Sequence, residues 1–170
     1  MSDEKLTIFK SKVMNMIVQY LTGIMKNDIS DAEHFLREQP KKYALSIINE
    51  MNNKSCKKMF DELNISDINI NKTSDNNNEY IYDVSVTLKY LDYVLDSNFN
   101  VVSGTDNRRI EKKINLKVVK KKNVTEADVY RCPGCGHSVN INESGKCQHC
   151  GAIFNLEDYD YQILEIEKVL

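Results

Sequence analysis

Four of the chain's five cysteines lie in two copies of one short motif, Cys-x-x-Cys-Gly, near the C-terminus. The first copy is Cys132–Gly136 and the second is Cys147–Gly151, with eleven residues between the two cysteine pairs. Each pair can direct two thiolates at one ion, and the glycine that follows can adopt a positive φ, which turns backbone amides toward the sulfurs. Four thiolates complete the tetrahedral coordination of zinc and leave no position for water or substrate. The sequence therefore predicts a zinc ribbon with one structural Zn2+, bound by Cys132, Cys135, Cys147 and Cys150.

Two alternatives to a four-thiolate site follow from the same stretch. An even number of cysteines can also form disulfides in a secreted module. We favour zinc because the chain opens without a secretory signal, which leads us to expect a reducing, cytoplasmic compartment. His137 and His149 lie beside the two motifs and could each replace a thiolate. Cys56, outside both motifs, is typical of a small apolar filler in a helix and less often of a reactive thiol.

Length and composition fit one ordinary domain with a small appendage. The chain has 170 residues, and its 41% share of apolar residues is enough to build a core. A net charge of −2 differs from the strongly basic character of domains devoted to nucleic acid. The predicted ribbon holds only two bases, Arg131 and Lys146, so we do not expect a nucleic-acid partner. No segment approaches the roughly eighteen consecutive apolar residues of a membrane-spanning helix.

Hydrophobic spacing divides the first part of the chain into three expected helices. In the first, apolar residues from Leu6 to Ile24 recur at three- and four-residue steps, so this helix should end near Asn27. The second is expected to begin with a capping box at Ser30. Pro40 suits the first turn of the third.

After the helices the spacing becomes alternating, which is typical of strands. An exposed turn is expected at 74–78, and tight turns are expected at 96–98 and at Ser103-Gly104, on either side of the short strand 99–102. The last expected strand should return from the ribbon to the main domain. Helices followed by an antiparallel sheet with one buried face predict an α+β fold. The expected strands are 68–70, 80–90, 99–102, 110–118 and 159–164.

Together these features resemble a known family. The segment Val101-Val102-Ser103-Gly104, the motif Cys-Pro-Gly-Cys-Gly and the stretches 145–151 and 158–164 are similar to bacterial members of the Tim44-like domain family. That family is named after the C-terminal domain of the mitochondrial import inner membrane translocase subunit 44. The resemblance spans nearly the whole chain and is most specific from Asp106 to Leu164. It implies a nuclear transport factor 2-like cone, in which N-terminal helices pack on a curved antiparallel sheet, with an appended zinc ribbon.

The resemblance also implies a division of the chain into three parts. Residues 1–129 would form the cone-like domain, 130–154 the zinc ribbon and 155–170 a C-terminal segment that returns to the cone. Family members often have tryptophan where this chain has Tyr161, and bacterial relatives frequently have a membrane anchor ahead of the domain. This sequence shows neither, so what the resemblance implies is the fold rather than a role in membrane import.

One strand of the expected sheet is strongly basic. Between Arg108 and Lys122 there are eight basic residues and one acid, or seven net positive charges in fifteen residues. The pattern indicates either a solvated sheet edge or a patch that attracts anionic lipid headgroups. The lipid interpretation requires the alternate residues of the strand to share one exposed face. The basic residues are Arg108, Arg109, Lys112, Lys113, Lys117, Lys120, Lys121 and Lys122.

Four tyrosines in the expected strand 80–90 and just after it form another candidate site. Tyrosines that alternate along a strand are typical of a core face whose hydroxyls reach the rim. The alternative is a pocket for an acyl chain or an apolar peptide segment. The tyrosines are Tyr80, Tyr82, Tyr90 and Tyr93.

No catalytic motif accompanies these features. Asp31 and His34 are three residues apart on an expected helix, a spacing that is common on solvated helix faces, and Asp83 is the other candidate partner of His34. The sequence has no nucleophile elbow, phosphate loop or metal motif with an open position. We therefore expect a non-catalytic binding or scaffold module that contacts a protein partner or an anionic membrane surface at the inner face of the membrane. A nucleic-acid-associated ribbon protein and a small-ligand-binding cone are the alternatives.

Overall fold

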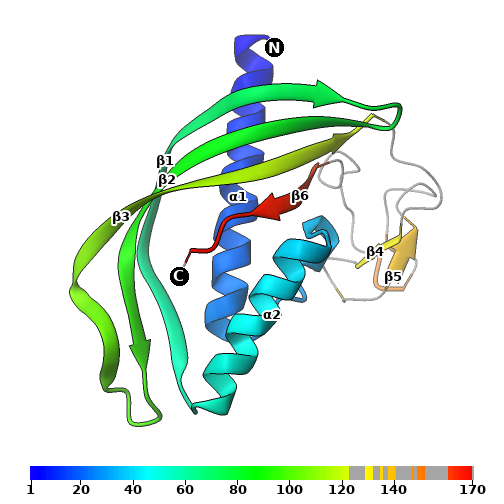
Figure 1. Ribbon diagram of the computed structural model, residues 1–170. Helices are drawn as coiled ribbons and strands as arrows, with labels where there is room; N and C mark the ends of the chain where they lie inside the picture. The colour runs from blue at the N-terminus through cyan, green and yellow to red at the C-terminus, as the bar shows by residue number, and fades with distance from the viewer. Residues whose placement is uncertain are drawn as a thin grey trace.

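The computed structural model describes residues 1–122, 129–131, 135, 138–140, 147, 149–151 and 161–169. In this part of the chain, two α-helices pack on a four-stranded antiparallel sheet of order β1-β2-β3-β6, which confirms the predicted α+β fold (Figure 1). The elements are α1 (Asp3–Lys26), the 3-10 turn η1 (Glu33–Phe35), α2 (Glu38–Asn53), β1 (Lys57–Asp75), β2 (Glu79–Leu95), β3 (Val101–Lys121), β4 (Val129–Arg131), β5 (Ser138–Asn140) and β6 (Tyr161–Ile166).

Helix α1 supplies one side of the hydrophobic core. The Ser2 hydroxyl caps its first turn by accepting from the Lys5 amide, and the helix ends at Asn27, whose φ of 57° is left-handed. The predicted end near Asn27 is thus confirmed. Neither described α-helix is long and apolar enough to span a membrane. The apolar side chains that α1 buries are Phe9, Val13, Met16, Ile17, Tyr20, Leu21 and Ile24.

The predicted helix at Ser30 is wrong, because this segment forms only the short turn η1. The Asp28 carboxylate, rather than Ser30, accepts the local hydrogen bond, from the Ser30 amide at 2.9 Å. Leu36 is then extended and bridges Ile163 of β6, while the Arg37 amide donates to the Ile163 carbonyl at 3.0 Å. Helical backbone cannot make this pairing with a strand, so contact with β6 ends the turn.

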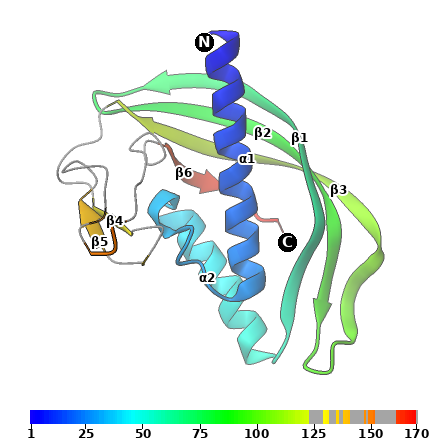
Figure 2. The same cartoon turned by 180° about the vertical axis from the view of Figure 1, so that it is seen from behind.

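The sheet bends around the helices, as the two opposite views show (Figures 1 and 2). The pairing of β1 with β2 shifts register at three places, between Asp61 and Asn64, between Ser66 and Asn69, and at Asn71. Two of these shifts contain left-handed residues, Glu62 at φ 50° and Asp67 at φ 51°. Extra residues of this kind bend the bulged strand and increase its twist. The inner face buries side chains of α1, α2, the strands and Val169, which follows β6, in one core.

Strand β3 is longer than predicted. The expected strands 99–102 and 110–118 are parts of one element, and the predicted turn at Ser103-Gly104 is wrong. Gly104 does have a positive φ, 76°, but it lies within β3 opposite Tyr93, beside a register shift. The turn between β2 and β3 occupies residues 96–100, which confirms the turn predicted at 96–98.

The C-terminal segment returns to the sheet as β6, antiparallel to β3, with Tyr161 opposite Lys120 and Ile166 opposite Leu116. The Gln39 side chain covers the outer edge of β6: its amide donates to the Ile166 carbonyl and its oxygen accepts from the Ile166 amide, both at 3.0 Å. An uncovered edge would be a template for pairing with other chains. Residues 159 and 160 lie outside the described residues, as does most of 123–160, so the bounds of the three predicted parts stay predictions.

Candidate functional site

Three cysteine thiols come together in a small unit built on a two-stranded ribbon. β4 and β5 pair antiparallel, with Arg131 opposite Ser138, and Cys135 lies in the connection between them. Cys147 and Cys150 follow β5 in the chain. The Sγ atoms of Cys135, Cys147 and Cys150 all lie within 4.8 Å of one another, and those of Cys135 and Cys147 are 3.8 Å apart.

This spacing fits a thiolate-bound metal. A tetrahedral zinc with Zn–S bonds of about 2.3 Å places its sulfurs about 3.8 Å from each other. A disulfide would require an S–S distance of about 2.05 Å, and none of these three cysteines forms one. Soft thiolates favour zinc over the hard cations magnesium and calcium. The donor set therefore suits a metal ion held by sulfur.

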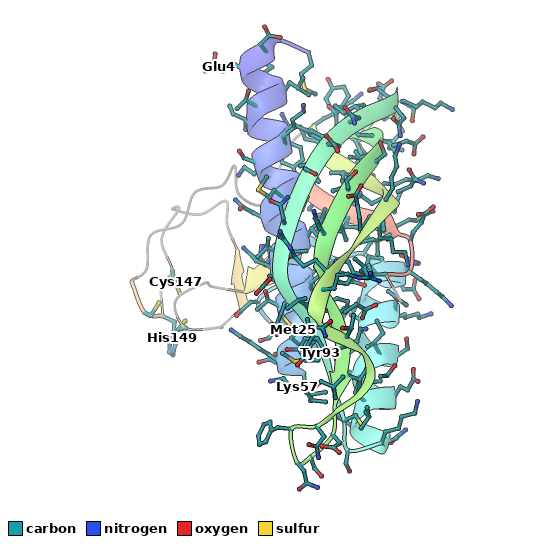
Figure 3. The ribbon with its side chains drawn as sticks, turned by 90° about the vertical axis from the view of Figure 1, so that its left-hand side faces the viewer. Glu4, Met25, Lys57, Tyr93, Cys147 and His149 are labelled. Atoms are coloured by element: carbon teal, nitrogen blue, oxygen red, sulfur yellow. The ribbon has the colours of Figure 1, made fainter. Side chains whose placement is uncertain are left out.

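The glycine of the second motif has the positive φ that the sequence predicts. The Gly151 amide donates to the Cys147 carbonyl at 2.8 Å, and Gly151 has a φ of 78°, which favours glycine. Cys147 is buried, at 1% exposure, whereas Cys150 and His149 are exposed. Figure 3 shows Cys147 and His149 beside each other. Among the described residues, the close group contains the three cysteines and not His149. Cys132, Gly136 and His137 lie outside the described residues.

Strand β3 distributes the predicted basic residues over both faces of the sheet. Ile114, Leu116 and Val118 are buried against the core, so even-numbered residues face inward and odd-numbered residues outward. Lys113, Lys117 and Lys121 therefore lie on the outer side, and Lys112 and Lys120 on the other. Arg108 and Arg109 lie in the register shift between Thr105 and Ile110, and Lys122 follows the end of β3, so the alternation assigns these three to neither face. A single face carrying all eight charges does not exist.

Several of these cations are engaged by neighbouring side chains. Lys117 pairs with Glu165 at 3.5 Å, and Lys122 pairs with Asp75 at 2.8 Å. The Nζ atom of Lys120 lies 5.5 Å from the centre of the Tyr161 ring, a cation–π contact. Such pairing leaves less charge for an external partner.

Lys112 lies near a carboxylate that is held by Asn115. Hydrogen bonds from the Asn115 side chain and amide to Glu167 lower the pKa of that carboxyl, and the charge of Lys112 lowers it further. By contrast, Arg108, Arg109 and Lys113 are exposed and have no acidic partner among the described residues. Arg109 donates to a backbone carbonyl, that of Glu62, at 3.4 Å.

The four predicted pocket tyrosines occupy different environments. Tyr82 and Tyr90 belong to the core, where burial raises the pKa of both hydroxyls, and Tyr90 donates to the Val169 carbonyl at 3.1 Å. Tyr93 donates to the Asp61 carboxylate, which raises its pKa to about 12. Tyr80 is 40% exposed, with the Lys122 ammonium 4.8 Å from its ring centre.

A groove of about 420 Å³ lies elsewhere, largely over the outer face of the sheet. None of the four tyrosines lines it. The sequence did not lead us to predict this groove. The polar residues at outward positions of the alternating strands were the signal that could have indicated it. Its polar lining is Gln39, Asn71, Asp83, Asn115, Lys117, Glu165 and Glu167.

Comparison with known proteins adds no assignment. No protein-family model matches the chain, and no curated protein matches it. The thiol cluster and the charged surfaces are therefore the features of this chain that bear on its function.

Proposed function

We propose that this chain is a non-catalytic binding or scaffold module with one structural zinc ion. The observation that carries the proposal is the approach of three Sγ atoms to within 4.8 Å of one another. Cys132 is the proposed fourth ligand, because it completes the first Cys-x-x-Cys pair with Cys135. Four thiolates would saturate the ion, so its chemistry would be to hold this part of the chain together rather than to activate water. The proposal includes the Tim44-like, cone-shaped fold that the sequence resemblance implies.

Metal analysis of the purified protein tests this proposal. We expect one zinc per chain after purification under reducing conditions, and four thiols that become reactive only when a chelator removes the ion. A protein without bound metal, or one with a water ligand exchangeable on the zinc, would contradict the structural role. Cys56 provides an internal reference, since its thiol should react equally with and without the chelator.

A second function, contact with an anionic membrane surface, is favoured by Arg108, Arg109 and Lys113. These three residues are exposed and have no acidic partner among the described residues. Basic residues near an anionic bilayer contribute on the order of 1 kcal/mol each. The proposed partner is therefore the anionic headgroup layer, with a protein partner at the same surface as the alternative.

Flotation with vesicles of phosphatidylcholine and phosphatidylserine tests the second function. We expect binding that weakens as salt rises, and a further loss when Arg108, Arg109 and Lys113 are all changed to glutamine. Lys117→Gln is the matched control, because Lys117 is already paired with Glu165. If the protein binds nucleic acid but not vesicles under the same salt conditions, the nucleic-acid alternative would replace this proposal.

A further inference from the structure

The tip of the β2–β3 hairpin is a compact loop of five residues, 96–100. The Asp96 amide donates to the Asn100 carbonyl at 2.9 Å. The Asp96 carboxylate accepts from the amides of Asn98 and Asn100, both at 2.9 Å. The loop is thus held by its own hydrogen bonds and presents its remaining side chains in a fixed direction.

Phe99 occupies an unfavourable position in this loop. Its φ is 64°, in the left-handed region where glycine or asparagine is usual and a bulky residue is strained. Burial of its side chain does not offset this strain, because the residue is 82% exposed. Strained residues of this kind are concentrated at functional sites. A phenylalanine that strains the backbone without joining the core suggests a contact outside the chain.

The exposed apolar surface continues into β3. Val101 is 39% exposed and Val102 is 55% exposed. β6 covers the edge of β3 only from Leu116 to Lys120, so the first part of β3 has no neighbour on that edge among the described strands. In Figure 1 this part of the hairpin extends away from the helices at the lower left.

The charge of the same arm is positive. From residue 101 to 113 of β3 there are four bases and two acids. Two acids of the neighbouring strands are already engaged: Asp92 pairs with the buried Lys58, and Asp61 accepts from Tyr93. The Asp96 carboxylate accepts hydrogen bonds from two loop amides. The arm therefore combines an apolar tip with a cationic stretch, the two features that interfacial binding to an anionic bilayer requires.

We propose that residues 99–113, the distal arm of the β2–β3 hairpin, form a membrane-contact element that inserts Phe99 into the interface of an anionic bilayer. This inference rests on the second function proposed above and adds an apolar anchor to it. Arg108 and Arg109 lie between the pairs Thr105–Asp92 and Ile110–Tyr90, where four residues of β3 lie opposite one of β2, so this stretch bulges and brings the arginines closer to the tip than a fully extended strand would. In this proposal the arm lies along the membrane surface, so that the tip and the arginines reach it together.

A single tryptophan offers a direct test, because the chain contains none. In Phe99→Trp, we expect the emission of the indole to shift to the blue when phosphatidylserine-containing vesicles are added. Ile8→Trp, at a residue of α1 that is 49% exposed, is the matched control and should not shift. No shift from Phe99→Trp, or equal shifts from both variants, would overturn the insertion of the tip.

A second variant separates the anchor from the basic residues. Phe99→Asn places a residue that tolerates positive φ in the loop, so its melting temperature should equal or exceed that of the parent chain. Vesicle binding in high salt, where the cationic contribution is screened, should fall about tenfold. If the parent binds in a salt-sensitive manner and Phe99→Asn binds equally well, the anchor is refuted and the second function stands. If the parent binds no vesicles at any salt concentration, both are refuted.

Discussion

Replacing Cys147 by serine is expected to weaken zinc binding by more than about a hundredfold, since even residues that only support a ligand contribute 10- to 100-fold. Cys147 is the most buried of the three described thiols, at 1% exposure, and its Sγ lies 3.8 Å from that of Cys135. A serine hydroxyl remains protonated at neutral pH and cannot replace the thiolate. Competition with a chelator of known zinc affinity measures the change.

Cys56→Ser is the control for this experiment, because Cys56 lies outside the thiol cluster and its Sγ contacts the Lys54 carbonyl at 3.4 Å. It should leave zinc affinity unchanged. Equal affinities for the parent chain and Cys147→Ser would mean that the thiol cluster is not the zinc site.

Loss of the metal should leave the α+β core folded. Thirty-eight residues separate Lys122 from Tyr161, and a cross-link that halves the effective length of such a loop changes its closure free energy by only about 0.6 kcal/mol. β6 is held independently of the thiols, by pairing with β3 and by the Gln39 side chain. Chelation should therefore change the melting temperature of the core only slightly.

Local patterns were sufficient to predict part of this structure. The three- and four-residue spacing from Phe9 to Ile24 identified α1, because a single helix face determines which of its residues are buried. The repeated Cys-x-x-Cys-Gly motif identified the cysteines that meet, because the ligands of each pair are local. In both cases, the interacting residues are close in the sequence or repeat a short motif.

Other features depend on contacts between distant segments, which the sequence does not display. Residues 30–36 have a helical pattern, but β6 draws Leu36 into an extended bridge. The basic pattern of β3 gave no indication that Glu165 and Asp75 would pair with Lys117 and Lys122. The wrong prediction at Gly104 has the same cause. This residue was predicted to lie in a turn, but pairing with β2 places it at an irregularity within a continuous strand.

Gly104→Ala should destabilise the protein by about 3 kcal/mol, because two penalties combine at this position. The φ of 76° costs an L-residue about 1–2 kcal/mol. An added Cβ would also lie 2.1 Å from the Asp92 carbonyl oxygen, so the backbones of β2 and β3 must separate. Chemical denaturation followed by circular dichroism measures the loss.

Ser103→Ala is the matched control, since Ser103 is the exposed neighbour of Gly104 in the same strand. It should change the free energy of unfolding by less than about 0.5 kcal/mol. If Gly104→Ala costs no more than Ser103→Ala, the close approach of the two strands is absent in solution. Gly104 lies within the arm, paired opposite Tyr93, so a separation of β2 and β3 at this position would also distort the arm. Gly104→Ala should consequently weaken vesicle binding together with stability, whereas Phe99→Asn should weaken binding alone.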